Sequence, residues 1–492
     1  MPGSRRIQFA LALLVALAVV PDAALAERTN WRVMRIGTFR VYSTLGDSRT
    51  RTIARELQAF SQTVGKMLEA DDRLPDIPTR VYLISHADMQ DYLADLPNTA
   101  GKFHHAPGEN VVVVDASADF GLVKRVIFGE FTSSILREHS VTLPIWYVIG
   151  YTELFSSFRL QGNDVFVGDL PAKLEVSRVG RPWIPVERIL AVKLNDPLFK
   201  VSESLMQFRG ESWALVHLLL FDTPDLLSPT SAYLSSMNLS TPEPEAFASA
   251  FSFDKAALDE KLRALIRREV IHIRKFTYNS PFAFDSVAIQ PLSALEADTE
   301  FARLTYLTGR PQKIIDKVVA VAVAQSPQNP DIRALAARVG AHAKAPIDIA
   351  DLATKFADGG TSDEQARVDV ADALLTRDTS APSAMQALAI LDGVIRGDSP
   401  SIEAVRYWAY AGRLAKLDPR RRLEVLEAAS ARTPHDTFIL THLAVASEEL
   451  GRYQAARGYY LRIMQVSLIP TERLWAQKQT DSERLQLPDS VR

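Results

Sequence analysis

The sequence predicts an α+β domain followed by an all-α series of repeated helices. Between Trp31 and Ser117, short runs rich in β-branched residues alternate with runs of helical periodicity. From about Ala297 onward, helix follows helix with a recurring spacing of prolines and small residues. The length of 492 residues exceeds that of a usual single domain. We therefore expect two structural parts joined by a linker.

Composition and charge narrow the classes of function. The chain is 47% hydrophobic and 23% charged, which is ordinary for a globular protein. Its formal net charge of -3 gives no basis for a nucleic-acid-binding protein or for strong attraction to membranes. Cysteine is absent, which excludes disulfides, thiolate metal sites and a cysteine nucleophile.

Residues 1–26 have the organisation of a signal peptide. Ser4-Arg5-Arg6 supplies the positive charge, Ile7–Val20 the apolar core, and Ala24-Leu25-Ala26 the cleavage site. The apolar run is short for a membrane span. We expect a periplasmic or secreted protein that begins near Glu27 and has no stable membrane span. General secretion is favoured over the twin-arginine route, and the alternative to cleavage is an uncleaved anchor.

The first part should contain a small mixed sheet. Apolar residues at helical spacing and runs of β-forming residues define its elements. We expect strands at Arg32–Ile36, Phe39–Tyr42, Arg80–Ile84, Lys102–His105 and Asn110–Asp115, and helices at Arg49–Glu69 and Ala87–Leu96. The last two strands should form a hairpin across Pro107-Gly108.

The next stretch, Leu122–Phe158, predicts two apolar helices joined at a turn near Thr142-Leu143-Pro144. It resembles the zinc-binding core of gluzincin-type (peptidase MA-like) metallopeptidases. That family carries H-E-x-x-H on one helix and L-P-x-W-x-x-E-G-x-A-E on the next. The corresponding segments here are Gly129-Glu130-Phe131-Thr132-Ser133 and Leu143–Glu153. The resemblance implies a zincin-like domain over residues 27–281.

The resemblance also implies that the zinc ligands are missing. In the family, two His four residues apart and a Glu from the next helix bind the metal. These positions hold Gly129, Ser133 and Ile149, of which only serine offers a donor, and a poor one. Glu130 matches the general base and Glu153 an outer carboxylate. We expect no zinc, no other cofactor and no peptidase chemistry, with the small residues and Ile149 forming a closed core. A metal-free acid–base pair of the two carboxylates is the alternative.

Residues 161–281 are predicted to be mostly helical. The run from Glu211 to His217 resembles the Q-S-W-A-L-V-H stretch that follows the core in related bacterial domains. His217 is more simply explained as a core or surface histidine than as a ligand. Lys255–Phe276 is predicted to be one amphipathic helix that closes the domain. The stretch Thr277–Leu292 contains two prolines and indicates a linker, which we place at residues 282–297.

The second part is similar to tetratricopeptide (TPR) repeats. Pro400 and Pro434 lie about 34 residues apart, the period of that family, and Pro330 lies about two periods earlier. The clearest copy contains Leu440, Leu443, Ala444, Gly451, Tyr453, Ala456, Tyr460 and Pro470. We expect about five helix pairs over residues 298–470 and a polar cap or frayed tail at 471–492.

Three functions fit these patterns. The favoured one is an inactive peptidase-like domain joined to a repeat scaffold that binds a protein or peptide in the cell envelope. The alternatives are a hydrolase with an unrecognised site and a purely structural scaffold. Such repeats usually bind partners on the concave face, which the first helix of each pair lines. The candidate contact residues, all predicted to lie outside the packing seam, are Arg406, Tyr410, Arg413, His442 and Glu449.

Overall fold

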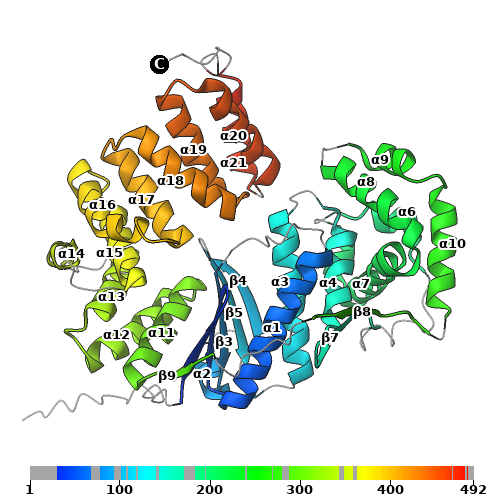
Figure 1. Ribbon diagram of the computed structural model, residues 1–492, viewed down its shortest axis with the longest axis horizontal. Coiled ribbons are helices and arrows are strands. Elements are labelled where there is room, and N and C mark those ends of the chain that lie inside the picture. The colour runs from blue at the N-terminus through cyan, green and yellow to red at the C-terminus, as the bar shows by residue number, and fades with distance from the viewer. Residues whose placement is uncertain are drawn as a thin grey trace, which may run out of the picture.

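The computed structural model describes residues 30–67, 78–92, 101–106, 109–117, 120–139, 143–170, 183–193, 196–238, 241–268, 270–279, 287–342, 348–357, 363–467, 469–482 and 485. The expected signal peptide and the Pro107-Gly108 turn lie outside these residues. Within them, a mixed sheet near the N-terminus is followed mainly by helices, as the expected α+β and all-α order requires (Figure 1).

The centre of the molecule is a six-stranded mixed sheet with the strand order β4-β5-β3-β2-β1-β9. Strands β2, β3 and β5 run parallel, and β1, β4 and β9 are antiparallel to their neighbours. The bounds are β1 (Arg32–Ile36), β2 (Phe39–Ser43), β3 (Thr79–Ile84), β4 (Gly101–Ala106), β5 (Glu109–Asp115) and β9 (Ile289–Pro291). Every residue of β3 and β5 is buried, which requires a cover on both faces of the sheet.

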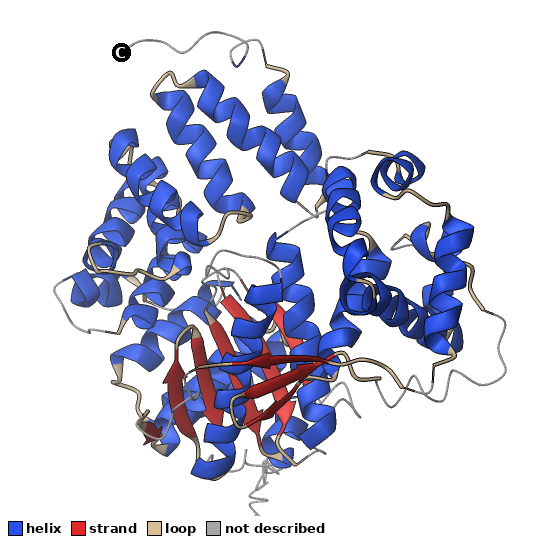
Figure 2. Ribbon diagram, turned by 45° about the vertical axis from the view of Figure 1, so that its right-hand side comes forward, coloured by secondary structure: helices blue, strands red, loops and turns tan. Residues whose placement is uncertain are grey.

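Helices α1 (Asp47–Met67) and α3 (Phe120–His139) cover one face of the sheet (Figure 1). The buried face of α1 repeats at helical spacing, and Phe60 of this helix packs into the same core as Val81 and Val112 of the sheet. Figure 2 shows the strands enclosed by helices. The short α2 (His86–Tyr92) follows β3 and packs on the opposite face through Tyr92.

The opposite face is covered by the first helices of the repeat region. Helices α11 (Ala294–Leu307), α12 (Gln312–Gln325) and α13 (Pro330–His342) share one hydrophobic core with β1, β2, β3 and β5. Within it, the ring of Trp31 meets that of Phe301 edge-on at 6.3 Å between centroids. The two parts predicted from the sequence are therefore not independent, because the repeats supply the second helical layer of the sheet.

The segment expected to be a linker is part of the sheet. Strand β9 pairs with β1, with Pro291 opposite Arg32, and α11 begins only three residues later. Proline is tolerated there because β9 is an edge strand, where a missing N–H breaks no ladder bond. Residues 280–286 lie outside the described part of the chain. The prediction of a linker at residues 282–297 is therefore wrong for its second half.

A helical lobe follows α3 in the chain. It contains α4 (Ile145–Ser156), α6 (Val186–Leu190), η2 (Pro197–Lys200), α7 (Ser202–His217), the π-helical η3 (Leu218–Asp222), η4 (Pro224–Leu226), α8 (Leu227–Asn238), α9 (Glu243–Ala250) and α10 (Lys255–Ile266). A second sheet in the order β6-β7-β8 is formed by β6 (Arg159–Gln161), β7 (Asp164–Val167) and β8 (Arg274–Thr277).

The prediction of one helix over Lys255–Phe276 is wrong. Helix α10 ends at Ile266, and Arg274–Thr277 forms β8, where Phe276 pairs with Val165. The intervening residues include Val270, Ile271 and Ile273. Such β-branched side chains lose rotamer freedom in a helix and favour extended backbone, which explains the change of structure.

The C-terminal part continues as helix pairs that form an arc from α13 beside the sheet to α21 (Pro470–Thr480) above it (Figure 1). After α11 and α12, the pairs are α13 with α14 (Ala350–Ala357), α15 (Glu364–Arg377) with α16 (Ala381–Ile395), α17 (Ile402–Leu414) with α18 (Pro419–Arg432), and α19 (Thr437–Glu449) with α20 (Tyr453–Val466). Helix α21 then packs on α20, where Trp475 contacts Tyr460, and caps the series.

Three of these pairs are joined by the same turn. The residues after α11, α17 and α19 that adopt positive φ are Gly309 (61°), Lys416 (55°) and Gly451 (71°). In each turn the next residue donates its N–H to the carbonyl five positions back, as in Leu417 to Gly412. This is a Schellman cap, for which glycine is preferred because it has no Cβ. The repetition seen in the sequence is thus also a repetition of backbone geometry.

Candidate functional site

The helices that carry the metallopeptidase-like segments, α3 and α4, pack side by side. Gly129 is buried, and a Cβ atom at this position would lie 3.3 Å from Cγ2 of Thr152. Thr152 follows Ile149 by three residues, which places the two on neighbouring positions of one helix face. Ser133 and Ile149 are half-buried, and Ile149 packs against the main core. The small residue at 129 therefore permits close approach of α4.

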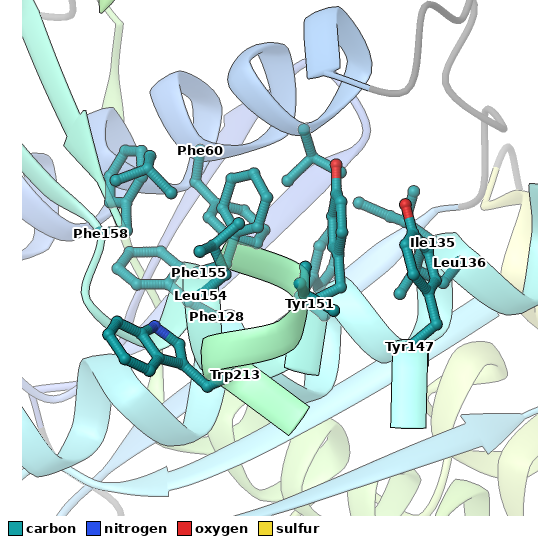
Figure 3. Close-up of a cluster of buried hydrophobic side chains, with 14 of the residues drawn as sticks. Phe60, Phe128, Ile135, Leu136, Tyr147, Tyr151, Leu154, Phe155, Phe158 and Trp213 are labelled. Carbon is teal, nitrogen blue, oxygen red and sulfur yellow. The ribbon is translucent and has the colours of Figure 1, made fainter. Parts of the chain in front are cut away.

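Aromatic side chains fill the region around this helix pair. Figure 3 shows Phe128 of α3 with Phe155 and Phe158 from α4 and the residues after it, and with Phe60 of α1. The ring centroids of Phe60 and Phe128 are 4.6 Å apart, and those of Phe128 and Phe158 are 4.9 Å apart. The three positions that match zinc ligands supply one hydroxyl and neither an imidazole nor a carboxylate. They do not fit a zinc ion.

The two carboxylates of the motif have different surroundings. Glu130 is exposed on α3. Glu153 is buried and forms an ion pair with Arg209 of α7. Among the described residues no interaction joins the two side chains, and no cluster of three His, Asp or Glu has a metal-binding arrangement. Glu153 therefore has a structural partner, and the alternative acid–base pair lacks the contact that it would need.

Helix α7 packs tightly against the other side of α4. A Cβ atom on Gly150 would lie 2.2 Å from the carbonyl oxygen of Ser212, closer than any real contact. His217 is buried, and its Nε2 donates to the carbonyl oxygen of His272 at 2.7 Å, so it is a core histidine as predicted. Burial lowers the pKa of this imidazole.

Glu211, the first residue of the segment that resembles Q-S-W-A-L-V-H, holds a loop in place. Its Oε2 accepts from the backbone N–H of Ile184 at 3.0 Å, and its Oε1 from Nε2 of Gln207 at 2.8 Å. Burial raises the pKa of this carboxyl group to about 7, against the lowering effect of the two hydrogen bonds. The side chain is therefore partly protonated near neutral pH.

The candidate contact residues of the repeats come together on α17 and α19. The Cζ atom of Arg406 lies 4.8 Å from the centre of the Phe438 ring, and that of Arg413 lies 5.6 Å from the centre of the Tyr410 ring. The Tyr410 and His442 rings meet edge-on at 6.3 Å. We call Arg406, Tyr410, Arg413, Phe438 and His442 the arginine–aromatic cluster. Phe438 was not among the sequence candidates.

His442 lies inside this cluster, so its predicted place outside the packing seam is wrong. It is 5% exposed and stacks on Phe438 at 4.2 Å. Its Nδ1 lies 3.0 Å from the Phe438 carbonyl oxygen and must carry the hydrogen, which makes Nε2 an acceptor. Nε2 is buried and has no partner among the described residues. Burial lowers the pKa of His442 to about 4, and nearby arginines add to the effect.

Glu449 is engaged by another residue of the scaffold. It forms an ion pair with Arg422 of α18, whose side chain is 2% exposed. The aliphatic part of Arg422 lies against Gly412, where a Cβ atom would be 3.0 Å from Cδ. Arg406 also has a partner, since its Nη1 lies 3.5 Å from Oδ2 of Asp436. Arg413 is exposed and makes no ion pair with any described residue, so it is the most available group of the set.

A chain of buried ion pairs that the sequence analysis missed joins the sheet to the first helices of the repeats. Arg80 of β3 donates to Glu109 of β5 at 2.7 Å and to Glu300 of α11 at 2.5 Å. Arg303 of α11 donates to Asp369 of α15 at 2.9 Å. The sequence contained one indication of these ion pairs, because Arg80 is a charged residue in a strand of mainly apolar residues.

The chain continues through Arg338 of α13. This guanidinium donates to Asp369 at 2.9 Å and to Glu403 of α17 at 2.7 Å, and its Nε lies 2.6 Å from Asp372. Burial alone would raise the pKa of Glu403, but the Arg338 guanidinium holds it below its usual value. The pKa of Glu109, by contrast, is raised by burial. These contacts link β3, α11, α13, α15 and α17 in one continuous set of buried ion pairs.

Comparison with known proteins adds no identification. No protein-family model matches the chain, and no curated protein matches it. Among the helices that the structure describes, none has the length and apolar character needed to span a membrane.

Proposed function

We propose that this chain is an exported pseudo-metallopeptidase with a TPR-like scaffold, which binds a protein or peptide in the cell envelope. The observation that carries the proposal is the arginine–aromatic cluster on α17 and α19. It combines the exposed guanidinium of Arg413, which makes no ion pair with a described residue, with the half-buried ring of Tyr410 beside it. Arginine and aromatic residues are enriched at the centres of protein interfaces.

The cluster has the chemistry to hold a peptide segment. Arg413 can bind a carboxylate of the partner, as guanidinium groups do with two parallel hydrogen bonds. The aromatic rings offer apolar contact area at a low cost in conformational entropy.

The helix pair α3 and α4 supports a role without catalysis. The three positions that correspond to the family's zinc ligands supply only the hydroxyl of Ser133, and Glu153 forms an ion pair with Arg209. A Glu130 without a metal or a neighbouring acid has no activated water to work with. The domain serves in this proposal as a rigid support to which the repeats are fixed through a shared core.

The test is capture of partners from an envelope extract by the full mature chain. A variant with Arg406→Ala, Tyr410→Ala and Arg413→Ala should lose the captured proteins that the unchanged chain retains. The matched control is Arg420→Ala with Arg462→Ala, which removes two exposed arginines from α18 and α20. Equal capture by the unchanged chain and the triple variant would place binding elsewhere.

A further inference from the structure

A cavity of about 220 Å³ lies between the sheet and the repeats. Strands β1 and β2 form one wall, and residues of α11, α13 and α15 with their preceding caps form the other. The residues that matter for its chemistry are Arg35, Arg40, Arg80, Glu300, Arg303 and Asn329. The liquid volume of one water is about 30 Å³, so the cavity has room for a small molecule.

Arg35 and Arg40 are an unusual pair in this wall. They are directly opposite each other in the antiparallel ladder of β1 and β2, so their side chains leave the same face of the sheet. Like charges at opposed positions destabilise a sheet unless something compensates them. Neither guanidinium forms an ion pair with a described residue, although the cavity also contains carboxylates.

Three of the four carboxylates that line the cavity, Glu296, Glu300 and Asp363, have other partners. Glu300 accepts from Arg80 at 2.5 Å and from the Tyr82 hydroxyl at 2.7 Å. Glu296 closes a capping box with Ser293, and Asp363 caps α15 by accepting from the N–H of Ala366. The other two arginines of the cavity, Arg80 and Arg303, are the ones with carboxylate partners. Within the described part of the chain, no carboxylate forms an ion pair with Arg35 or Arg40.

We propose that this cavity binds a small oxyanion whose carboxylate or phosphate group bridges Arg35 and Arg40. Two guanidinium groups on one face match the paired oxygens of either group. Arg35 is exposed and Arg40 half-buried, which leaves an entry path from solvent. Asn329 also lines the cavity, and because its Oδ1 accepts from the N–H of Asp331 at 2.9 Å, its amide nitrogen is the group that could donate to a ligand.

The ligand would contact both parts of the molecule. Its anionic group is held by the sheet, and its remainder lies against α11 and α13, which cover that sheet. Binding would therefore stabilise the docking of the repeats on the sheet, because a ligand that binds only the docked form raises its stability. This site is separate from the arginine–aromatic cluster, and its occupancy does not depend on a partner protein.

The experiment is calorimetric titration of the full mature chain with inorganic phosphate and, in a second arm, with succinate, at constant ionic strength set with chloride. We expect saturable binding of at least one of the two, and the tighter one identifies the class of oxyanion. The variant Arg35→Ala with Arg40→Ala should bind at least tenfold more weakly. The control Arg462→Ala with Arg473→Ala, which removes two exposed arginines from α20 and α21, should bind as the unchanged chain does.

A melting experiment distinguishes the loss of an anion-binding site from misfolding of the double variant. Without ligand, the Arg35 and Arg40 double variant should melt at the same temperature as the unchanged chain or higher, since a like-charge contact is removed. With the tighter anion, only the unchanged chain and the control should gain stability. Absence of saturable binding by both anions, or equal affinity in the double variant, would overturn the proposal.

Discussion

At single buried positions of the helical lobe, the stability of the fold depends on the protonation state or the size of one side chain. Glu211 is 5% exposed and its pKa is raised to about 7 by burial. Between pH 4.5 and about pH 7, the folded protein therefore keeps the proton of Glu211, whereas the unfolded chain has already released it. Ionising this group in the folded state costs stability as the pH rises.

We therefore predict that Glu211→Gln changes the pH dependence of unfolding. Relative to the variant, the unchanged protein should lose about 2.5 kcal/mol of unfolding free energy between pH 5 and pH 8. Most of the loss should fall below pH 7, and the curve should flatten above it. Urea unfolding at several pH values measures the difference. A difference between the unchanged protein and Glu211→Gln that stays constant with pH would contradict the argument.

Glycine positions allow a second test at this scale. Gly150→Ala places a methyl group 2.2 Å from a backbone oxygen of α7, which cannot move without separating the helices. We expect a loss of about 3 kcal/mol, the range of overpacked cores. Gly393→Ala on α16 is the control, because a Cβ there meets no atom within 4 Å. Better helix propensity should stabilise this second variant by up to about 1 kcal/mol. Thermal unfolding compares the two.

At the scale of elements, the packing of α3 against α4 can be tested by placing zinc ligands on the two helices. The contact between Gly129 and Thr152 places these helices face to face near Ile149. Replacing Gly129 and Ser133 with His and Ile149 with Glu puts three ligands on facing helices, if the zincin-like arrangement is present. The bulky polar groups enter a packed region, so the variant should be destabilised by several kcal/mol without metal.

Zinc should then restore stability to this triple variant. We expect its melting temperature to rise with zinc and to fall again with a chelator, because metal binding to a preformed site adds to folding free energy. Magnesium should have no effect, since the site has too few oxygen ligands. Gly129→His alone is the control and should gain little from zinc. A triple variant that folds but ignores zinc would contradict the zincin-like geometry.

At the scale of the whole molecule, the shared core makes the N-terminal domain dependent on the repeats. A chain of residues 27–281 would expose the sheet face that Phe301 and Leu335 cover, and would lack β9. We predict that this fragment unfolds without cooperativity or aggregates, while residues 27–342, which include α11 to α13, unfold cooperatively. Circular dichroism and light scattering compare them. A monomeric fragment 27–281 with a sharp transition would show that the two parts are independent.

Much of the fold could be predicted from local patterns. The strands from Arg32 to Asp115, the two apolar helices and the paired helices of the repeats follow from periodicity and turn residues, which act over short stretches. Strand β9 could not be predicted, because its three residues become a strand only through pairing with β1. Of the candidate site, the grouping of Arg406, Tyr410 and Arg413 follows from helix spacing. The burial of His442 depends on its stacking on Phe438 and its contact with Tyr410, which the sequence alone did not predict.

The pairing of β9 with β1 sets the order in which the molecule can be completed. Roughly 260 residues of chain separate Arg32 from Pro291, and contacts over such a distance slow folding. A ribosome synthesises the whole helical lobe before the last strand of the central sheet exists. During that interval β1 is an open edge and the face that α11 will cover is exposed to solvent. Until the chain has been made as far as α13, it therefore exposes an unpaired strand edge and an apolar sheet face, the features that favour aggregation.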